Sequence, residues 1–187
     1  MASNLYTKKI LLDADQMRRV IRRMAGELVE GHQGTTDLVL VGIRTRGVPL
    51  AEKLAGEIRA MEGIEVPIGT LDITLYRDDL SLVAPQPVVK DTRFPVSIDD
   101  RTLVLCDDVL FTGRTVRAAL DALTDYGRPR AVRLAVLVDR GRRELPIQAD
   151  LVGLEIPTSA NEVIKVCFPA TDDGAEVVKL LDRENHG

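Results

Sequence analysis

The sequence predicts an α/β fold in which helices cover both faces of a doubly wound, mainly parallel sheet, with one hairpin or lid projecting from it. Two short, continuous apolar runs, at residues 38–41 and 103–106, are typical of strands that a parallel sheet buries on both faces, and a further strand is expected over residues 132–138. Helical segments alternate with these runs, and this alternation favours right-handed βαβ crossovers. The length of 187 residues suits one well-filled domain, so we expect a single domain over residues 1–187.

The composition narrows the class of protein. Hydrophobic residues make up 45% of the chain and charged residues 29%, as in soluble globular proteins. No apolar run approaches the roughly 18 residues of a membrane span, and residues 1–10 lack the core of a signal peptide. Cys106 and Cys167 belong to no Cys-x-x-Cys or Cys/His cluster, so we expect core thiols in a reducing compartment, the cytoplasm. The net charge of −4 argues against a protein coated with nucleic acid but permits a local basic face.

An amphipathic helix is predicted first, with Asp13 or Asp15 near its N-cap. Its apolar stripe has helical spacing and comprises Met17, Val20, Ile21, Met24, Ala25 and Leu28. The other flank carries Arg18, Arg19, Arg22 and Arg23, whose like charges repel one another by a few tenths of a kcal/mol per pair. Two interpretations stay open for this flank: a solvated face or subunit contact, and a surface for nucleic acid or an acidic partner.

The strand at 38–41 leads into a basic loop, Gly42-Ile43-Arg44-Thr45-Arg46-Gly47, and then into a helix that begins near Val48-Pro49. Exposed amides together with Arg44 and Arg46 suit a diphosphate, because guanidinium groups bind phosphate in a bidentate manner. Taken alone, the loop could equally be a plain turn.

A third strand is expected over Asp72–Leu80, leading into a stretch that contains Pro85, Pro87 and Pro95 and shows no helical stripe. We expect a β-hairpin or lid of roughly twenty residues, because long irregular segments in compact domains are usually functional. Arg77, at its root, could reach a diphosphate when the lid closes. The alternative is an exposed loop with incidental charge.

The most informative segment runs from Leu103 to Thr115. An apolar strand delivers Asp107 and Asp108 to the sheet edge where α/β proteins bind ligands, and the loop Thr112–Thr115 can aim backbone amides at a phosphate. The carboxylates would repel that phosphate, so they suit ribose hydroxyls, directly or through hydrated Mg²⁺. No Walker loop occurs in the chain. The alternative is an ordinary strand, an acidic turn and a helix cap.

The remaining elements follow in order. A helix is predicted over residues 116–126, with Val116, Leu120 and Leu123 facing inward and Gly127 as its C′ residue. The strand 132–138 then brings residues 139–146 to the same sheet edge, where a base could be held. A last strand pair is expected around 151–154 and 162–168.

The segment 103–115 resembles the signature of type I phosphoribosyltransferases. Three further segments make the chain similar, over about residues 12–166, to the bacterial family of bifunctional pyrimidine operon attenuation regulators and uracil phosphoribosyltransferases. These segments are 42–47, 72–80 and 134–141. The resemblance implies a type I phosphoribosyltransferase fold and transfer of ribosyl phosphate from 5-phosphoribosyl 1-diphosphate (PRPP) to uracil, giving UMP and diphosphate with Mg²⁺. A purine-using transferase is disfavoured by the family-specific segments.

The resemblance also implies roles for individual residues. Asp107 and Asp108 would act at the ribose and hold the metal, and Arg77 would assist at the diphosphate. The diphosphate loop would comprise Arg44, Thr45, Arg46 and Gly47. The signature would contribute Leu103, Val104, Leu105, Cys106, Val109, Leu110, Phe111, Thr112, Gly113, Arg114 and Thr115, with the 5′-phosphate at Thr112–Thr115. The uracil site would be lined by Val138, Asp139, Arg140 and Ile164.

The family's second role is to bind a messenger RNA leader when UMP or UTP occupies the site, and its members form dimers or larger even assemblies. Gln148, Leu154 and Ala160 stand where the family has basic residues, and Glu155 adds a negative charge. The basic residues left for RNA are Arg18, Arg19, Arg22, Arg23 and Arg143. Three hypotheses follow: an enzyme that also regulates through RNA, an enzyme alone, and a non-catalytic nucleotide sensor. The sensor is disfavoured, because it would not need the diphosphate loop.

Overall fold

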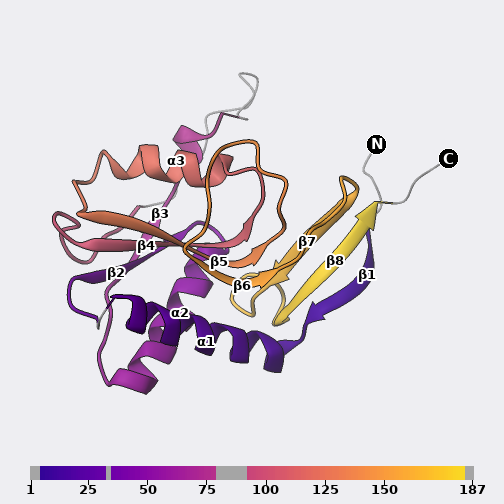
Figure 1. Cartoon of the computed structure of the whole chain (residues 1–187), viewed down its shortest axis with the longest axis horizontal. Coiled ribbons are helices and arrows are strands. Elements are labelled where there is room, and N and C mark those ends of the chain that lie inside the picture. Colours follow the sequence, from indigo (N-terminus) through magenta and orange to yellow (C-terminus); the bar gives the residue numbers. More distant parts are fainter. Residues whose placement is uncertain (1–4, 33–34, 79–91, 184–187) are drawn as a thin grey trace.

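The computed structural model describes residues 5–32, 35–78 and 92–183. A five-stranded parallel sheet has the strand order β3-β2-β4-β5-β6, and a separate three-stranded antiparallel sheet has the order β1-β8-β7 (Figure 1). The elements in chain order are β1 (Leu5–Leu12), α1 (Ala14–His32), β2 (Leu38–Ile43), α2 (Gly47–Glu62), β3 (Ile68–Leu71), the 3₁₀ helix η1 (Thr74–Tyr76), β4 (Thr102–Leu110), α3 (Arg114–Leu123), β5 (Ala131–Asp139), β6 (Leu151–Glu155), β7 (Glu162–Cys167) and β8 (Val177–Arg183).

The predicted doubly wound sheet is confirmed. Helices α1 and α2 cover one face of the parallel sheet and α3 covers the other (Figure 1). Each face has its own hydrophobic core, one built with the inner sides of α1 and α2 and the other with that of α3. Strand β2 is buried at every residue, as expected for a strand in the middle of a parallel sheet. No helix in the described part of the chain is long and apolar enough to cross a membrane.

Helix α1 forms where its apolar spacing predicts. Met17, Ile21, Met24, Ala25 and Leu28 are its buried residues. Of the two expected caps, Asp13 is the one used: its Oδ1 accepts a hydrogen bond from the Gln16 backbone N–H at 2.8 Å. The Gln16 side chain reaches back to the Asp13 N–H at 2.9 Å, which completes a capping box.

The predicted third strand over Asp72–Leu80 is wrong. Strand β3 lies just before it, at residues 68–71, and η1 follows. The buried Asp72 explains the break, because its Oδ1 accepts hydrogen bonds from both the N–H (2.9 Å) and the hydroxyl (2.5 Å) of Thr74. This turn competes with continued strand pairing. The expected hairpin or lid falls mostly on residues 79–91, outside the described residues.

The helix predicted over residues 116–126 ends earlier than expected. Helix α3 ends at Leu123, and residues 124–126 form tighter turns that donate three residues back. Gly127 therefore is not its C′ residue. Leu120 is 40% exposed, because the small side chains Ala119 and Ala122 take the inward positions beside Val116 and Leu123.

Strands β6 and β7 exist as predicted but do not pair with each other. Strand β6 extends the parallel sheet beside β5, whereas β7 pairs with β8 in the antiparallel sheet. Strands β1 and β8 were not predicted. Their register joins Leu5 to Arg183 and Leu12 to Val178, so opposite ends of the described chain form adjacent strands.

Candidate active site

The site lies at the carboxyl ends of β2, β4 and β5. From β2 the chain crosses through α2 to β3 on one side, and from β4 it crosses through α3 to β5 on the other. Strands β2 and β4 are direct neighbours, with Gly42 opposite Cys106. Their carboxyl ends are therefore the switch point of the sheet, where open α/β sheets bind ligands. The predicted diphosphate loop and the predicted aspartate pair meet at this point.

Two glycines allow the loop after β2 to approach β4 closely. A Cβ on Gly47 would lie 2.1 Å from the Cys106 carbonyl oxygen, and one on Gly42 would lie 2.4 Å from the Val48 Cα. A larger residue at Gly47 would push the start of α2 away from β4, and one at Gly42 would push it away from β2. The intervening Arg44–Thr45 peptide bond is cis. Arg44 and Thr45 are exposed, and Arg46 is half-buried.

The aspartate pair lies within β4, which continues past Cys106 to Leu110. Asp107 is 7% exposed, and its Oδ1 accepts the Asp108 backbone N–H at 3.0 Å. The Oδ1 of Asp108 accepts the Val109 N–H at 2.9 Å. Burial raises the pKa of both carboxyl groups, and the neighbouring Asp108 raises that of Asp107 further, whereas nearby Arg46 favours the charged form of Asp108.

The chemistry of these carboxylates suits Mg²⁺. Each still has an oxygen not used by the local N–H, and oxygen is the donor that Mg²⁺ prefers. In the described segments, no three acidic, histidine or cysteine side chains cluster as a metal site. Two carboxylates with substrate phosphates and waters are nevertheless a usual Mg²⁺ environment.

Arg46 has an ion-pair partner that sequence reasoning missed. Its Nη2 lies 2.8 Å from Oδ1 of Asp172 and its Nε lies 3.3 Å from Oδ2, so the pair is bidentate. Asp172 follows β7, and its carboxylate also accepts the Thr171 hydroxyl (2.6 Å) and the Phe168 N–H (3.2 Å). The hydrogen bond from Arg46 contributes most to holding the pKa of Asp172 well below its ordinary value. No sequence signal marks Asp172, because it lies in an irregular segment 126 residues away.

The loop after β4 forms the second predicted phosphate site. Gly113 has φ +93°, a left-handed conformation that favours glycine, and α3 begins at the next residue. The Thr112 hydroxyl accepts the Arg114 N–H at 3.3 Å. A pocket of about 140 Å³ opens here and is lined by Arg77, Asp78, Thr112, Arg114 and Thr115. Arg77 therefore lies beside Thr112–Thr115.

The loop after β5 carries a buried arginine. Arg140 is 6% exposed, and its Nε donates to the Thr158 hydroxyl at 2.8 Å. Its Nη2 donates to the carbonyls of Ser159 (3.3 Å) and Glu162 (2.7 Å). The guanidinium lies 4.0 Å from the ring centroid of Phe111, so it also contacts the loop after β4.

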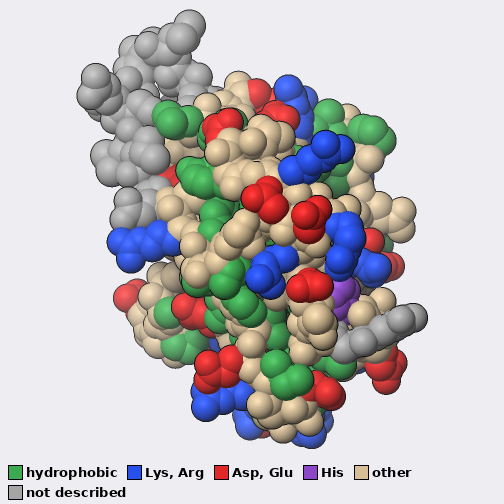
Figure 2. Space-filling view, turned by 90° about the vertical axis from the view of Figure 1, so that its left-hand side faces the viewer, with side chains coloured by type: hydrophobic (Ala, Val, Ile, Leu, Met, Phe, Trp, Pro, Cys, Tyr) green, Lys and Arg blue, Asp and Glu red, His purple; other side chains and the backbone are tan. Residues whose placement is uncertain are grey.

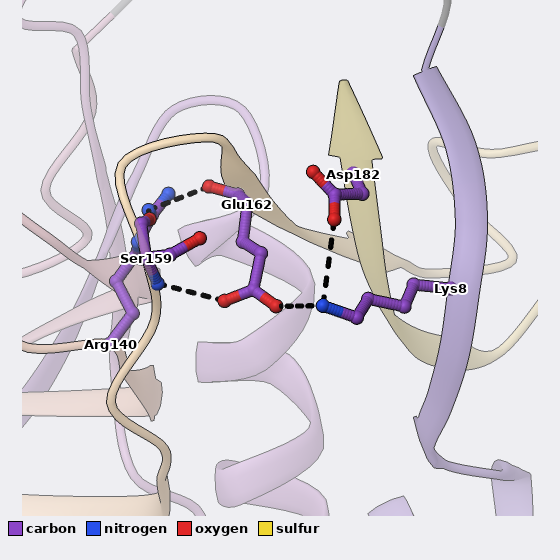
Figure 3. A network of polar contacts seen from close by, with 5 residues as sticks. All are labelled: Lys8, Arg140, Ser159, Glu162 and Asp182. Carbon is purple, nitrogen blue, oxygen red and sulfur yellow. Dashed lines mark hydrogen bonds and ion pairs between the residues drawn. The ribbon is translucent and has the colours of Figure 1, made fainter. Parts of the chain in front are cut away.

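A polar network connects Arg140 to the second sheet (Figure 3). The Glu162 carboxylate accepts the Ser159 N–H at 2.8 Å and pairs with Lys8 Nζ at 2.7 Å. Lys8, on β1, also lies 3.5 Å from Asp182 on β8. The hydrogen bond from Lys8 contributes most to lowering the pKa of Glu162 to about 2. The segment that holds Arg140 is thus braced by β1.

Several predicted site residues have side chains in the core, closed to a ligand. Six of these residues are at least 98% buried: Leu103, Val104, Leu105, Cys106, Leu110 and Val138. Ile164 is 7% exposed. Burial also raises the pKa of the Cys106 thiol to about 12, so this cysteine stays protonated. These residues shape the strands that carry the site.

The arginines predicted for RNA have different surroundings. On α1, Arg18 pairs with Asp15, and Arg23 pairs with Glu27 at 2.6 Å while donating to the Gly153 carbonyl at 2.6 Å. A groove of about 380 Å³ is lined by Asp15, Arg18, Arg19, Arg22 and Glu57. On the side of the molecule that lies at left in Figure 1, basic and acidic side chains are interspersed (Figure 2).

Arg143 differs from the arginines of α1 because it points into its own loop. It pairs with Asp139 and donates to the carbonyls of Phe111 (2.9 Å), Gly141 (3.2 Å) and Ile147 (2.9 Å). These contacts join the loops after β4 and β5. Its guanidinium therefore has a structural use within the site loops.

Comparison with known proteins gives consistent matches. The family model for the phosphoribosyl transferase domain matches residues 8–171. The protein from Deinococcus radiodurans named bifunctional protein PyrR is 54% identical over 178 residues, which are 95% of this chain and 97% of the relative. The proteins of the same name from Pelotomaculum thermopropionicum and Thermus thermophilus are 57% and 56% identical, over 94% and 95% of this chain and 96% and 97% of their own lengths.

Solved structures show the same fold at low identity. The hypoxanthine phosphoribosyltransferase of Trypanosoma cruzi superposes with a TM-score of 0.72 at 18% identity, covering 95% of this chain and 98% of that one. The hypoxanthine phosphoribosyltransferase of Staphylococcus aureus gives 0.70 at 20% identity, covering 96% and 94%. Both therefore share the overall fold of this chain.

Proposed function

The chain belongs to the phosphoribosyltransferase family and, within it, to the group of bifunctional PyrR proteins, and from this premise we propose that it is a uracil phosphoribosyltransferase. The reaction converts uracil and PRPP to UMP and diphosphate. Residues 1–187 act as one catalytic domain in this proposal. A cytoplasmic location is part of it, in keeping with the two free, buried cysteines.

One observation carries the proposal most directly. Two loops suited to phosphate groups, 44–46 and 112–115, follow neighbouring strands of the sheet. An aspartate pair, with Asp107 buried and Asp108 half-buried, lies on the strand before the second loop. PRPP has the matching chemistry, because its ribose hydroxyls stand between a 5-phosphate and a 1-diphosphate. In the proposed complex, Thr112–Thr115 bind the 5-phosphate and Arg44–Arg46 bind the diphosphate.

The proposed chemistry is substitution at the anomeric carbon. The bond from that carbon to the diphosphate oxygen breaks, the bond to uracil N1 forms, and N1 gives up its proton. Positive charge develops on the ribose and negative charge on the departing diphosphate. Arg44 and Arg46 stabilise the departing charge, and the carboxylates of Asp107 and Asp108 orient the ribose hydroxyls and stabilise the cationic ring. Uracil is held by the loop after β5, at Asp139 and Arg140.

Magnesium belongs to this proposal as the partner of PRPP. Asp107 and Asp108 are the residues that would hold it, together with oxygens of the substrate. When bound, the ion supplies positive charge that offsets the negative charge of the diphosphate.

The proposed second role is regulation of a pyrimidine biosynthesis operon by transcription attenuation, through RNA binding that depends on UMP or UTP. The bifunctional relatives and the exposed arginines of α1 support it. The protein acts as a dimer or larger even oligomer in this proposal. Filter binding to a pyrimidine-operon leader hairpin, with and without UMP across a salt series, tests it. UMP-enhanced binding that weakens with salt is expected.

One observation favours the alternative of an enzyme without RNA binding. Arg143 is engaged by its own loop, and Gln148, Leu154 and Ala160 contribute no charge where the family is basic. Absence of RNA binding at low salt, from protein that makes UMP, would establish this alternative.

Chromatographic detection of product tests the enzymatic proposal. Purified protein with Mg²⁺ and PRPP is incubated with uracil and, in parallel, with hypoxanthine. UMP formation from uracil alone is expected. Formation of IMP without UMP would contradict the proposal and assign the site to purines.

A further inference from the structure

Arg77 lines a pocket beside the loop after β4, away from the loop after β2. As the residue at the root of a hairpin, it is expected to help Arg44 and Arg46 at the diphosphate. In the structure it lines the pocket beside Thr112, Arg114 and Thr115, and that pocket includes neither the loop 44–46 nor the aspartate pair. The diphosphate loop follows β2, whereas this pocket lies at the start of α3 after β4.

The neighbours of Arg77 in the sequence fix its position along α3. On one side, the Tyr76 hydroxyl donates a hydrogen bond to Asp125, just beyond the C-terminal end of α3. On the other side, Asp78 accepts a hydrogen bond from Arg114 Nη1 at 2.6 Å and lies 3.7 Å from Arg117 Nη1, both near the N-terminal end. The backbone of Arg77 is therefore held between two contacts to α3.

The pocket brings two guanidinium groups together. Its lining contains Arg77, Arg114 and one aspartate, Asp78. Arg114 pairs with Asp78 at 2.6 Å and with Glu144 at 2.8 Å from its Nε. Arg77 places a second guanidinium in this pocket, at the N-terminal end of a helix whose backbone N–H groups favour a bound anion.

We propose that Arg77 binds the 5-phosphate of the phosphoribosyl group and makes the site specific for 5-phosphorylated ribose. This inference rests on the proposed function for its ligand. It differs from a role at the diphosphate in one testable respect. A residue of the 5-phosphate site contributes to the binding of UMP, which carries a 5-phosphate and no diphosphate.

Isothermal titration calorimetry of Arg77→Gln separates the two phosphate sites. The titrants are UMP, uridine, ribose 5-phosphate and inorganic diphosphate with Mg²⁺. UMP and ribose 5-phosphate should bind about tenfold more weakly than to the wild type, the loss expected for one charge-assisted phosphate contact. Binding of uridine and diphosphate should be unchanged. Arg77→Lys should recover part of the loss, because lysine restores the charge without the bidentate geometry.

Arg117→Gln is the matched control. It removes the same charge from a residue that also faces Asp78, yet Arg117 does not line the pocket. Its affinities for all four titrants should equal those of the wild type. An equal loss of affinity in both variants would mean that the two arginines act only through long-range electrostatic attraction. That result would overturn the proposal.

The other outcomes are equally distinct. Weaker diphosphate binding by Arg77→Gln with unchanged UMP binding would return Arg77 to the diphosphate site, and unchanged binding of every titrant would remove it from both. The ribose 5-phosphate titration keeps this test separate from the enzymatic proposal. Failure of the wild type to make UMP would refute uracil transfer, while a loss of ribose 5-phosphate affinity confined to Arg77→Gln would still support the assignment of Arg77.

Discussion

Asp172 shows how one residue can organise a site without belonging to any motif. Its carboxylate occupies the Nε and Nη2 edge of the Arg46 guanidinium, which leaves the opposite edge of that planar group for a ligand. The Thr171 hydroxyl and the Phe168 N–H fix the carboxylate in turn. Arg46 is therefore held in one orientation before any diphosphate arrives.

The pair makes stability depend on pH. Because the folded-state pKa of Asp172 lies below its ordinary value of 3.8, the stabilisation is full above about pH 4 and is lost as the pH falls through the folded value. Asp172→Asn should lower the free energy of unfolding by about 1 kcal/mol at pH 7, since Arg46 is partly open to solvent. Urea unfolding at pH 7 and pH 3 measures this difference, which should shrink at the lower pH.

Asp173→Asn is the control for that experiment. Asp173 is exposed and has φ +46°, a conformation that asparagine tolerates as well as aspartate does. Its unfolding curve should match that of the wild type at both values of pH. An equal loss of stability in the two variants would show that Arg46 is not the partner that matters.

The aspartate pair differs from Asp172, because its removal should cost activity without costing stability. Placing two adjacent carboxylates in a strand, one buried and one half-buried, is unfavourable for folding, and the proposed ligand gives a reason for their place in β4. Asp107→Asn with Asp108→Asn should abolish UMP formation while the melting temperature stays at or above that of the wild type. Activity assays with differential scanning calorimetry test this. Unchanged activity would refute the ribose assignment, and a large fall in melting temperature would show a structural role.

At the scale of elements, the antiparallel sheet braces the loop that would hold the base. Lys8 on β1, Glu162 on β7 and Asp182 on β8 form one contact series across the three strands, and Glu162 continues it to Ser159 (Figure 3). Arg140 hydrogen-bonds to the backbone of the same segment. The order of this segment therefore depends on a strand outside the parallel sheet.

Glu162→Gln tests the brace. Glutamine keeps the shape but loses the charge that attracts Lys8, so KM for uracil should rise severalfold while KM for PRPP changes little. Asp182→Asn is the matched control, because the Asp182 carboxylate meets the same Lys8 at 3.5 Å but lies on β8, whereas the Glu162 carboxylate also accepts the Ser159 N–H. Equal rises in both KM values for Glu162→Gln would indicate a general loss of structure instead.

The same carboxylate predicts acid sensitivity. Its pKa falls from 4.5 to about 2 on folding, so its contribution is present above about pH 4.5 and is lost as the pH falls toward 2. Wild type and Glu162→Gln should therefore differ in stability at pH 6 and converge near pH 2, as followed by circular dichroism. A constant difference across this range would contradict the ion-pair interpretation.

The arginines of α1 differ in whether they contact the parallel sheet. Arg23 tethers the helix to β6 through the carbonyls of Val152 (3.2 Å) and Gly153 (2.6 Å), whereas Arg22 is exposed in the groove beside Glu57. Arg23→Gln should cost about 1 kcal/mol of stability. Arg22→Gln should leave stability unchanged and lower the salt slope of leader-RNA binding by about one. An unchanged slope would remove Arg22 from the RNA surface.

For the whole molecule, the features that sequence reasoning predicted correctly are local. The buried strands, the glycine-bounded loop 42–47, the capped helix α1 and the switch-point position of Asp107 and Asp108 each follow from residues close together in the chain. Such patterns are visible because strand and helix periodicity act over a few residues.

The features that were missed depend on distant partners. Strand β1 is exposed at its first six residues, so no apolar pattern announces it, and it forms only by pairing with β8. The contact between Arg46 and Asp172 spans 126 residues, and the expected strand over Asp72–Leu80 gave way to a turn made by one buried carboxylate. The contact of η1 with the end of α3, between Tyr76 and Asp125, likewise joins residues that are far apart in the chain.

The pairing of β1 with β8 also sets an order of folding. During synthesis, the parallel sheet from β2 to β6 can assemble while the last strand is still inside the ribosome, but β1 has no partner until that strand emerges. Lys8 reaches Glu162 only after this late step. We therefore expect a newly made molecule to form the loops 44–46 and 112–115 first and to order the segment around Ser159 last.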